Sequence, residues 1–536
     1  MNLAVVGVDG LDPHLVSQWE DDLPTLQSLI QGGTFSKLHS SHPPLSSPAW
    51  PTLFTGKQSG KHGVFGFTKE VEGTHRREPI NYSDVMSESL WEALDASGVA
   101  CGVANVPISY PPTSLENGFL LSGWPIPNRA DTISHPKSLL SELEAEIDEP
   151  YQVNPFPMLP ELSGKSPGKI VDTIVEGMRH HHRAFTYLLE SHDVDVFFGV
   201  YMAIDHASHH LAWTPEKLKE VYIKQDQVLN DLIGSLDDDT DVVVVSDHGH
   251  GIQGNRKFYT NEWLMEEGYL SLKESTSNRL RQFGKRAMQS LGIHRQNVLG
   301  IKDLLGLDNI RSRLPDTVFR FLKRTIPDEQ DMEYDPGLVD WEETVAYAPD
   351  QNVVYINDIE FDHSEKERVE LRNEIAYKLR SIDHPDPEID GSLMSKVTTS
   401  DTIFQGPYSE RGPDIICIAD DMRCGVHASF NSSGIFGRKH WGEHREYGVL
   451  LTNGPTFKNL SNPKPVAIED VFPMVLLLAG AEIPQSIDGS ISEERIKGEI
   501  KPVYRSDIDM STRDSSYSAS EAEDIRDQLE GLGYLR

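Results

Sequence analysis

The chain has 536 residues, enough at about 150 residues per domain for three or four compact units with a large core. It carries 84 acidic and 49 basic side chains, a formal net charge of −35, and a field of this sign argues against a general affinity for the nucleic-acid backbone. The three cysteines are too few for a disulfide framework, which indicates a reducing compartment.

Short, apolar, β-branched runs alternate along the chain with helical patterns. The runs that we predict to be buried strands span residues 3–8, 98–106, 194–201, 241–246 and 447–452. One helical pattern opens with Thr214 as N-cap and Pro215 in the first turn. The alternation is typical of an α/β fold with a largely parallel sheet, in which ligands bind beyond the carboxyl ends of the strands.

Two long insertions interrupt this alternation. We predict a catalytic core in three parts, two insertions and a tail: core at 1–124, 186–270 and 436–492, a Pro-rich and helical insertion at 125–185, a cap insertion at 271–435, and an acidic, Ser-rich tail at 493–536 that could end in a short helix. The cap insertion holds a segment, 279–324, with eleven basic and three acidic side chains. This segment is either an exposed amphipathic helix pair or a basic lid that meets an anionic substrate or a lipid surface.

The sequence also predicts a cytoplasmic location. The first residues lack a basic region followed by an apolar signal core. The longest apolar run, 471–481, is well short of the roughly 20 residues that a membrane span needs. The strong acidity indicates a high-salt cytoplasm, where salt screens self-repulsion; activity that rises steadily as salt is removed would contradict this expectation.

Four separated segments offer side chains that bind divalent metal ions. They hold Asp9, Asp205 with His209, Asp247 with His248, and His444. Each is a weak signal alone, because an aspartate at a strand end often caps a helix. Asp205 and His209 are four residues apart, so a helix would place both on one face. Four valines are followed by Ser246, Asp247 and His248, which puts a carboxylate and an imidazole together at a strand end.

A hydroxyl in PPLSSPAW, either Ser46 or Ser47, completes the set. Three aspartates, three histidines and one serine provide seven ligands, enough for two divalent ions with open positions. Imidazole and carboxylate donors without thiolate suit Zn, which we favour, or Mn or Fe. A serine oxygen on such an ion would ionise near neutral pH and become a nucleophile for displacement at phosphorus.

The segments that carry these residues resemble a known family. VVGVDGLD, PPLSSPAWPTLFTGKQSGKHGVFGF, AIDHASHH, VVVVSDHGHG and GEHREYGVLLTNGP occur in this order. They are similar to the type I phosphodiesterase and nucleotide pyrophosphatase branch of the alkaline phosphatase superfamily, and more closely to its microbial group of predicted phosphohydrolases or phosphomutases. The resemblance covers most of residues 1–490 and implies an alkaline-phosphatase-like α/β/α sandwich with a central, mostly parallel sheet and inserted cap regions.

The resemblance also implies a division of the ligands. One ion falls to Asp205, His209 and His444, and the other to Asp9, Asp247, His248 and the nucleophile. The family nucleophile stands two residues before a proline, and this register selects Ser46 rather than Ser47.

Three departures from the family pattern bear on the substrate. Serine replaces the usual threonine at the nucleophile. Ala49 stands where nucleotide-cleaving members carry asparagine, which weakens a nucleotide pyrophosphatase interpretation. No arginine follows Ser46 closely, which argues against a sulfatase and against the monoester clamp of alkaline phosphatases.

The resulting prediction is a two-metal phosphoric ester hydrolase that favours diesters and acts through a phosphoseryl intermediate on Ser46. Its substrate would be a small-molecule phosphate ester or a lipid or sugar phosphoester. A phosphotransferase or phosphomutase on the same core is one alternative, and a non-catalytic metal- or membrane-surface-binding protein is another. The sequence does not indicate the oligomeric state.

Overall fold

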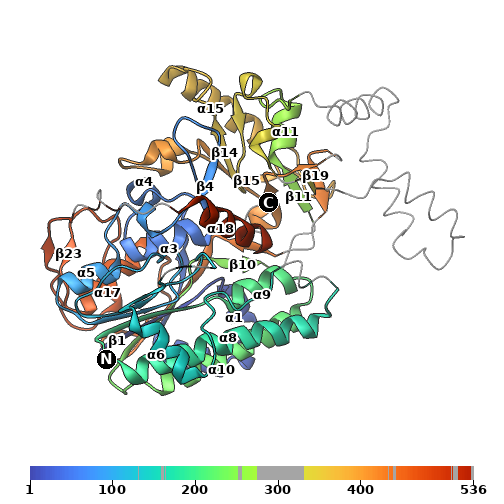
Figure 1. The fold of residues 1–536 in the computed structure, drawn as a ribbon. Helices are drawn as coiled ribbons and strands as arrows, with labels where there is room; N and C mark the ends of the chain where they lie inside the picture. Colours follow the sequence, from blue (N-terminus) through green and yellow to red (C-terminus); the bar gives the residue numbers. More distant parts are fainter. Residues whose placement is uncertain are drawn as a thin grey trace, which may run out of the picture.

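Two β-sheets dominate the structure, a computed structural model of the chain (Figure 1). The residues described are 1–128, 130, 132–158, 162, 164–251, 256–273, 331–332, 334–431, 434–438, 442–508, 510, 513 and 517–532. The basic segment predicted at 279–324 lies outside them. Within the described part of the chain, no helix is both long and apolar enough to span a bilayer.

The larger sheet has nine strands, and its centre is parallel. In spatial order the strands are β22 (Val466–Ala467), β2 (Thr34–His39), β21 (Tyr447–Asn453), β9 (Asp241–Val245), β1 (Leu3–Val8), β8 (Val196–Tyr201), β5 (Cys101–Ala104), β6 (Gly118–Leu121) and β7 (Ser134–His135). The five strands from β9 to β6 run parallel to one another, while β21 and β7 are antiparallel to their inner neighbours. All residues of β1, β8 and β9 are buried, as expected for strands covered on both faces.

Helices cover both faces of this sheet (Figure 1). One layer contains α3 (Ser46–Thr55), α5 (Leu90–Ala96) and α17 (Val471–Leu478). The other contains α2 (Pro24–Gly32), α6 (Ser138–Ile147), α8 (Pro167–Ser191), α9 (Ala203–Leu211) and α10 (Pro215–Gly234). The predicted α/β/α sandwich with a central, mostly parallel sheet is therefore confirmed.

The smaller sheet forms a second body above the first (Figure 1). Its strands, in order, are β13 (Ala346–Tyr347), β14 (Val353–Ile356), β16 (Ile415–Ala419), β17 (Cys424–His427), β11 (Arg256–Tyr259) and β19 (Phe436–Arg438), and β15 (Met394–Thr399) also pairs with β16. The helices α11 (Thr260–Glu266) and α15 (Glu365–Arg380) contribute to a hydrophobic cluster that is separate from the main core. We refer to residues 256–438 of the described chain as the cap.

A short antiparallel ribbon joins the two bodies. The chain passes through β10 (Gly249–Gly251) on its way into the cap and through β20 (Glu443–Arg445) on its return. Because β21 follows β20 and runs antiparallel to β9, its start lies at the edge where β9 ends. Side chains that flank the two ends of the cap thus reach the carboxyl edge of the central strands. Near the C-terminus, α18 (Ala519–Leu532) packs against β4 (Arg77–Pro79).

Candidate metal centre

Three neighbouring strands deliver carboxylates to one edge of the large sheet. Asp9 follows β1, Asp247 follows β9, and Asp205 lies in the first turn of α9, which follows β8. Gly10 permits the close approach, because its φ is +72° and a Cβ there would lie 2.9 Å from the Cα of Asp205. All three carboxylates are fully buried.

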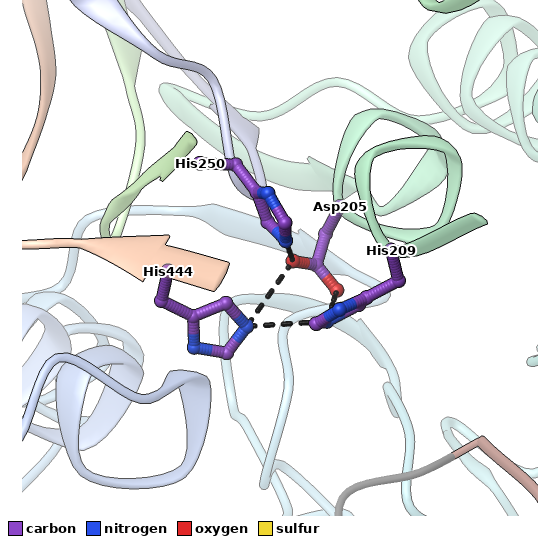
Figure 2. A group of neighbouring side chains, drawn as sticks. All are labelled: Asp205, His209, His250 and His444. Atoms are coloured by element: carbon purple, nitrogen blue, oxygen red, sulfur yellow. Dashed lines mark hydrogen bonds and ion pairs between the residues drawn. The ribbon is translucent and has the colours of Figure 1, made fainter. Parts of the chain in front are cut away.

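The first cluster combines Asp205 with three imidazoles (Figure 2). The Nε2 atoms of His209 and His444 lie 3.2 Å apart. Asp205 places Oδ2 3.4 Å from His209 Nε2 and Oδ1 3.5 Å from His444 Nε2. These spacings match the edges of a tetrahedron with bonds of about 2.0–2.1 Å, which are about 3.4 Å long. His250 Nε2 lies 3.8 Å from Asp205 Oδ1 and offers a fourth donor.

The second cluster contains Asp9, Asp247, His248 and Ser46. His248 Nε2 is 3.1 Å from Ser46 Oγ, 3.2 Å from Asp247 Oδ2 and 3.8 Å from Asp9 Oδ1. Each carboxylate has one oxygen engaged: Trp50 Nε1 donates to Asp9 Oδ2, and the Gly10 amide donates to Asp247 Oδ1. Asp9 Oδ1 and Asp247 Oδ2 have no hydrogen-bond partner among the described residues. The unengaged oxygens therefore converge with an imidazole nitrogen on one small volume.

Backbone carbonyls orient two of the imidazoles. His248 Nδ1 lies 3.1 Å from the Gly249 oxygen, and His444 Nδ1 lies 3.1 Å from the Pro44 oxygen. A nitrogen that faces a carbonyl carries a proton, so in both rings Nε2 is the atom that can bind an ion inside a cluster. Hydrogen bonds of this kind are the usual support for metal-bound histidines. The two rings stack with centroids 3.9 Å apart, which places the clusters side by side.

Burial and mutual repulsion dominate the electrostatics of the carboxylates in this site. Burial, followed by repulsion from Asp247 and Asp205, raises the pKa of Asp9, and burial and Asp205 raise the pKa of Asp247 to about 8. Burial and His444 lower the pKa of His248, so its ring is neutral. Burial opposes ionisation of Asp205 as well, but His209 and His444 hold its pKa well below the ordinary value. The neutral imidazole of His248 beside the crowded carboxylates of Asp9 and Asp247 is a donor set that fits a divalent cation.

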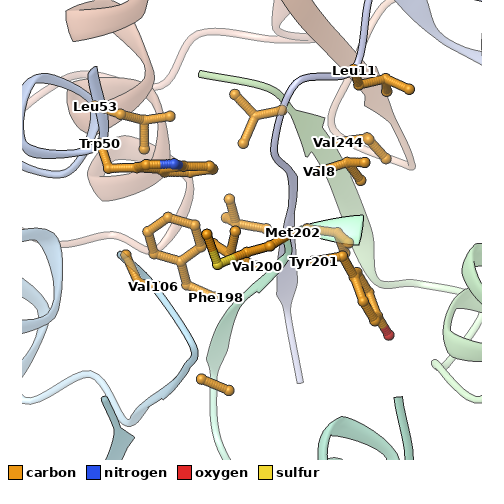
Figure 3. Packing of buried hydrophobic residues seen from close by; sticks show 14 of the residues in the cluster. Val8, Leu11, Trp50, Leu53, Val106, Phe198, Val200, Tyr201, Met202 and Val244 are labelled. Carbon is orange, nitrogen blue, oxygen red and sulfur yellow. The ribbon is translucent and has the colours of Figure 1, made fainter. Parts of the chain in front are cut away.

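Trp50 joins the hydrophobic core to this site. Its ring lies near Phe198 and beside Leu53, with a ring-centroid distance of 6.3 Å to Phe198 (Figure 3). The close approach requires Gly7 in β1, where a Cβ would lie 2.7 Å from the Trp50 ring. Packing thus fixes the indole so that Nε1 donates to Asp9 Oδ2 at 3.0 Å.

We expect Trp50→Phe to weaken metal binding by about 10-fold or more while the chain stays folded. Phenylalanine keeps an aromatic ring in the core but removes the donor that orients Asp9. Calorimetric titration of the metal-free protein with ZnCl2 measures the effect. Trp91→Phe is the matched control, because the indole of Trp91 is equally buried but donates to Thr113. Equal metal affinities of the two variants would contradict the role of Trp50.

The structure brings all seven residues chosen from the sequence into the two clusters. It also distinguishes between the two candidate serines: Ser46 Oγ faces His248, whereas Ser47 Oγ is buried and has no hydrogen-bond partner among the described residues. Sequence reasoning missed His250. The signal was present in the alternation of His248 and His250 across one glycine, but only the pairing of His250 with His444 in the ribbon shows that it reaches the site.

The fold and the paired clusters define a class: an α/β protein of the alkaline phosphatase type with two buried carboxylate and imidazole clusters that fit a two-metal site. A family model described as Type I phosphodiesterase / nucleotide pyrophosphatase matches residues 3–422. The chain belongs to this family, and the resemblance drawn from its sequence motifs is confirmed. With this membership, the protein is identified as a phosphodiesterase-family enzyme.

Solved structures of known proteins share this fold. Human ectonucleotide pyrophosphatase / phosphodiesterase 5 is 13% identical with a TM-score of 0.50, over 93% of this chain and 100% of that chain. Phosphonoacetate hydrolase from Sinorhizobium meliloti 1021, in complex with phosphonoformate, is 14% identical with a TM-score of 0.51, over 90% and 95%. At these identities the likeness shows the fold alone.

A curated relative matches a shorter stretch. GPI ethanolamine phosphate transferase 3 of Saccharomyces cerevisiae is 27% identical over 122 residues. The match covers 23% of this chain and only 12% of the yeast protein.

Proposed function

We propose that the protein hydrolyses phosphoric esters, diesters in preference to monoesters, through a phosphoseryl intermediate on Ser46. The observation that carries the proposal is the position of Ser46 Oγ, 3.1 Å from His248 Nε2, in a cluster that adjoins the Asp205 cluster. Asp9, Asp247, His248 and Ser46 would hold one ion, and Asp205, His209 and His444 the other. Zn is our first choice, with Mn or Fe as alternatives.

The chain itself prepares Ser46 for attack. Ser46 is the first residue of α3, so its oxygen lies at the positive end of the helix dipole, which stabilises developing negative charge. His248 Nε2 lies 3.1 Å from Ser46 Oγ, so both atoms could bind the same ion. Bound ions would stabilise the ionised serine oxygen and the negative charge on the phosphoryl and leaving oxygens.

The reaction then has two displacements at phosphorus. Ser46 Oγ forms a bond to phosphorus in line with the ester bond that breaks, and the alcohol leaves with a proton. Water next attacks the phosphoserine, and the Oγ–P bond breaks to return Ser46 with release of a monoester. Ala49 and Trp50, the residues that follow Pro48, are fully buried and bring no cation to the phosphoryl group, which supports a diester over the more highly charged monoester.

The test is a panel of aryl phosphate mono- and diesters with the metal-loaded chain. We expect a higher kcat/KM for bis-(4-nitrophenyl) phosphate than for 4-nitrophenyl phosphate. Activity should disappear with a chelator and return when Zn or Mn is restored. Equal activity before and after complete metal removal would refute the proposal.

A phosphotransferase is the second candidate, supported by the 122-residue likeness to a protein named as an ethanolamine phosphate transferase. An alcohol would then replace water in the second displacement. With ethanolamine or glycerol added at high concentration, a transfer product in excess of the hydrolysis product would favour this function. Hydrolysis product alone would exclude it for those acceptors.

A further inference from the structure

A third group of metal-ligand side chains lies outside the two clusters. His39 ends β2, His42 stands four residues before Ser46, and Glu446 lies between β20 and β21. Each offers one ligand atom, and these atoms all lie within 4.8 Å of one another. The backbone holds the group together, because the Ser40 amide donates to the Glu446 carbonyl at 2.9 Å.

His39 faces Glu446 at a spacing that suits two ligands of one cation. His39 Nδ1 lies 3.0 Å from the Ser40 carbonyl and therefore carries a proton, which leaves Nε2 as the nitrogen that can bind an ion. This Nε2 faces Glu446 Oε1, 3.4 Å away. Two electron-pair donors at this distance repel each other unless a proton or a metal ion lies between them. The distance equals the edge of about 3.4 Å expected for two ligands of one tetrahedral ion.

His42 completes the donor set. Its ring centroid lies 5.1 Å from that of His39, with the rings at 74° to one another. Burial, with Lys396 and His39 acting in the same direction, lowers the pKa of His42 to about 4. The ring is therefore neutral at physiological pH and has a lone pair to donate. Two neutral imidazoles and one carboxylate are a set known from zinc sites with an open position.

Lys396 from the cap occupies part of this site. Its Nζ lies 2.5 Å from Glu446 Oε1, the same oxygen that faces His39 Nε2. The ammonium group of Lys396 neutralises the charge of Glu446. A metal ion would do the same and would also be coordinated by a nitrogen of each of the two imidazoles. The side chains of His39 and Glu446 are 31% and 26% exposed, so ions reach them from solvent.

We propose that His39, His42 and Glu446 form a third divalent-cation site of the zinc type, in which the ion exchanges with the Lys396 ammonium. This site adjoins the candidate metal centre through two chain segments. Residues 39–46 lead from His39 to Ser46, and Glu446 follows His444 by two residues. The Pro44 carbonyl between His42 and Ser46 accepts the hydrogen bond that orients His444. An ion here ties the Ser46 segment to the His444 segment and releases Lys396, a contact between cap and core.

The test counts ions rather than turnover, so its result is independent of the proposed hydrolysis. Full-length protein is saturated with ZnCl2, passed through a desalting column and analysed for zinc by mass spectrometry. We expect three ions per chain in the wild type and two in each of His39→Gln and His42→Gln. In a zinc titration, the affinity of the third site should fall at least about 100-fold in both variants. The loss of a hydrogen bond that only supports a ligand causes a smaller fall.

The variant Lys396→Met distinguishes a third metal site from an ion pair between Lys396 and Glu446 that binds no metal. Removing the competing ammonium should tighten the third site about two- to fivefold, the range expected for a partly exposed ion pair. His363→Gln is the control, because His363 lies 3.1 Å from Asp358 but belongs to no three-ligand group of the described residues, and its zinc count should equal that of the wild type. A wild-type zinc count that does not exceed the count of both His39→Gln and His42→Gln would overturn the proposal, whatever the number of ions at the candidate metal centre.

Discussion

Ser46→Ala is expected to lower kcat by about four to six orders of magnitude, the usual cost of losing a catalytic nucleophile. The phosphoseryl intermediate cannot form without Oγ, and no other hydroxyl is aimed at His248 Nε2 in the described part of the chain. Metal content should remain near that of the wild type, because Asp9, Asp247 and His248 keep their geometry. Steady-state kinetics and zinc analysis on the same preparation measure both quantities.

The neighbouring hydroxyl gives a matched control. Ser47 Oγ is equally buried but has no hydrogen-bond partner among the described residues, so Ser47→Ala removes no interaction and should leave kcat within about twofold. With a diester that is hydrolysed slowly, the phosphoryl group of the substrate should be found covalently bound to the wild type and should be absent from Ser46→Ala. If Ser47→Ala were the inactive variant instead, the register inferred from Pro48 would be wrong.

The fold was accessible from the sequence because its central strands are buried on both faces. Continuous apolar runs such as 3–8 and 242–245 are short, β-branched and bounded by polar or turn residues, which favours strands covered by helices on both faces. The order of the strands was not accessible, since β21, which comes late in the chain, inserts between β2 and β9 as an antiparallel strand. That insertion decides which side chains enter the site, because it brings His444 to the edge where β9 ends.

The candidate ligands were chosen from the sequence by residue type, spacing and family resemblance. That they bind metal ions stays a prediction. The sequence showed that Asp9, Asp247 and His248 end strands, but not what orients them. The donation of Trp50 to Asp9 depends on Gly7, far from Trp50 in sequence and in contact with its ring only in the packed core. His250 escaped notice because its partner across the ribbon is almost 200 residues away.

Removing the metal ions should make the stability of the protein strongly dependent on pH. In the metal-free chain the pKa of Asp247 is about 8, against 3.8 for the ordinary side chain. Between these values the folded state holds a proton on Asp247 that the unfolded state has lost, so the contribution of this group to the free energy of unfolding falls as pH rises from about 4 to about 8. Buried histidines such as His248, whose pKa is lowered, act in the opposite direction up to the ordinary histidine pKa of 6.5, so we expect the net fall above that pH. Each such group contributes at most about 1.4 kcal/mol per pH unit. Asp9, whose pKa burial also raises, acts in the same direction as Asp247.

Bound ions should cancel this loss, because they neutralise the carboxylates and bind only the folded chain. We expect the melting temperature of the zinc-loaded protein to exceed that of the chelated protein by about 10 °C at pH 8, with a clearly smaller difference at pH 5. Thermal unfolding followed by tryptophan fluorescence gives both values.

Asp247→Asn should raise the melting temperature of the chelated protein at pH 8, because it removes a buried charge. Asp350→Asn is the control: Asp350 is buried with a pKa of about 6 but lies outside both clusters, so its replacement should leave the difference between loaded and chelated protein unchanged. A difference in melting temperature between zinc-loaded and chelated protein that does not depend on pH would show that the buried carboxylates do not bind the ions.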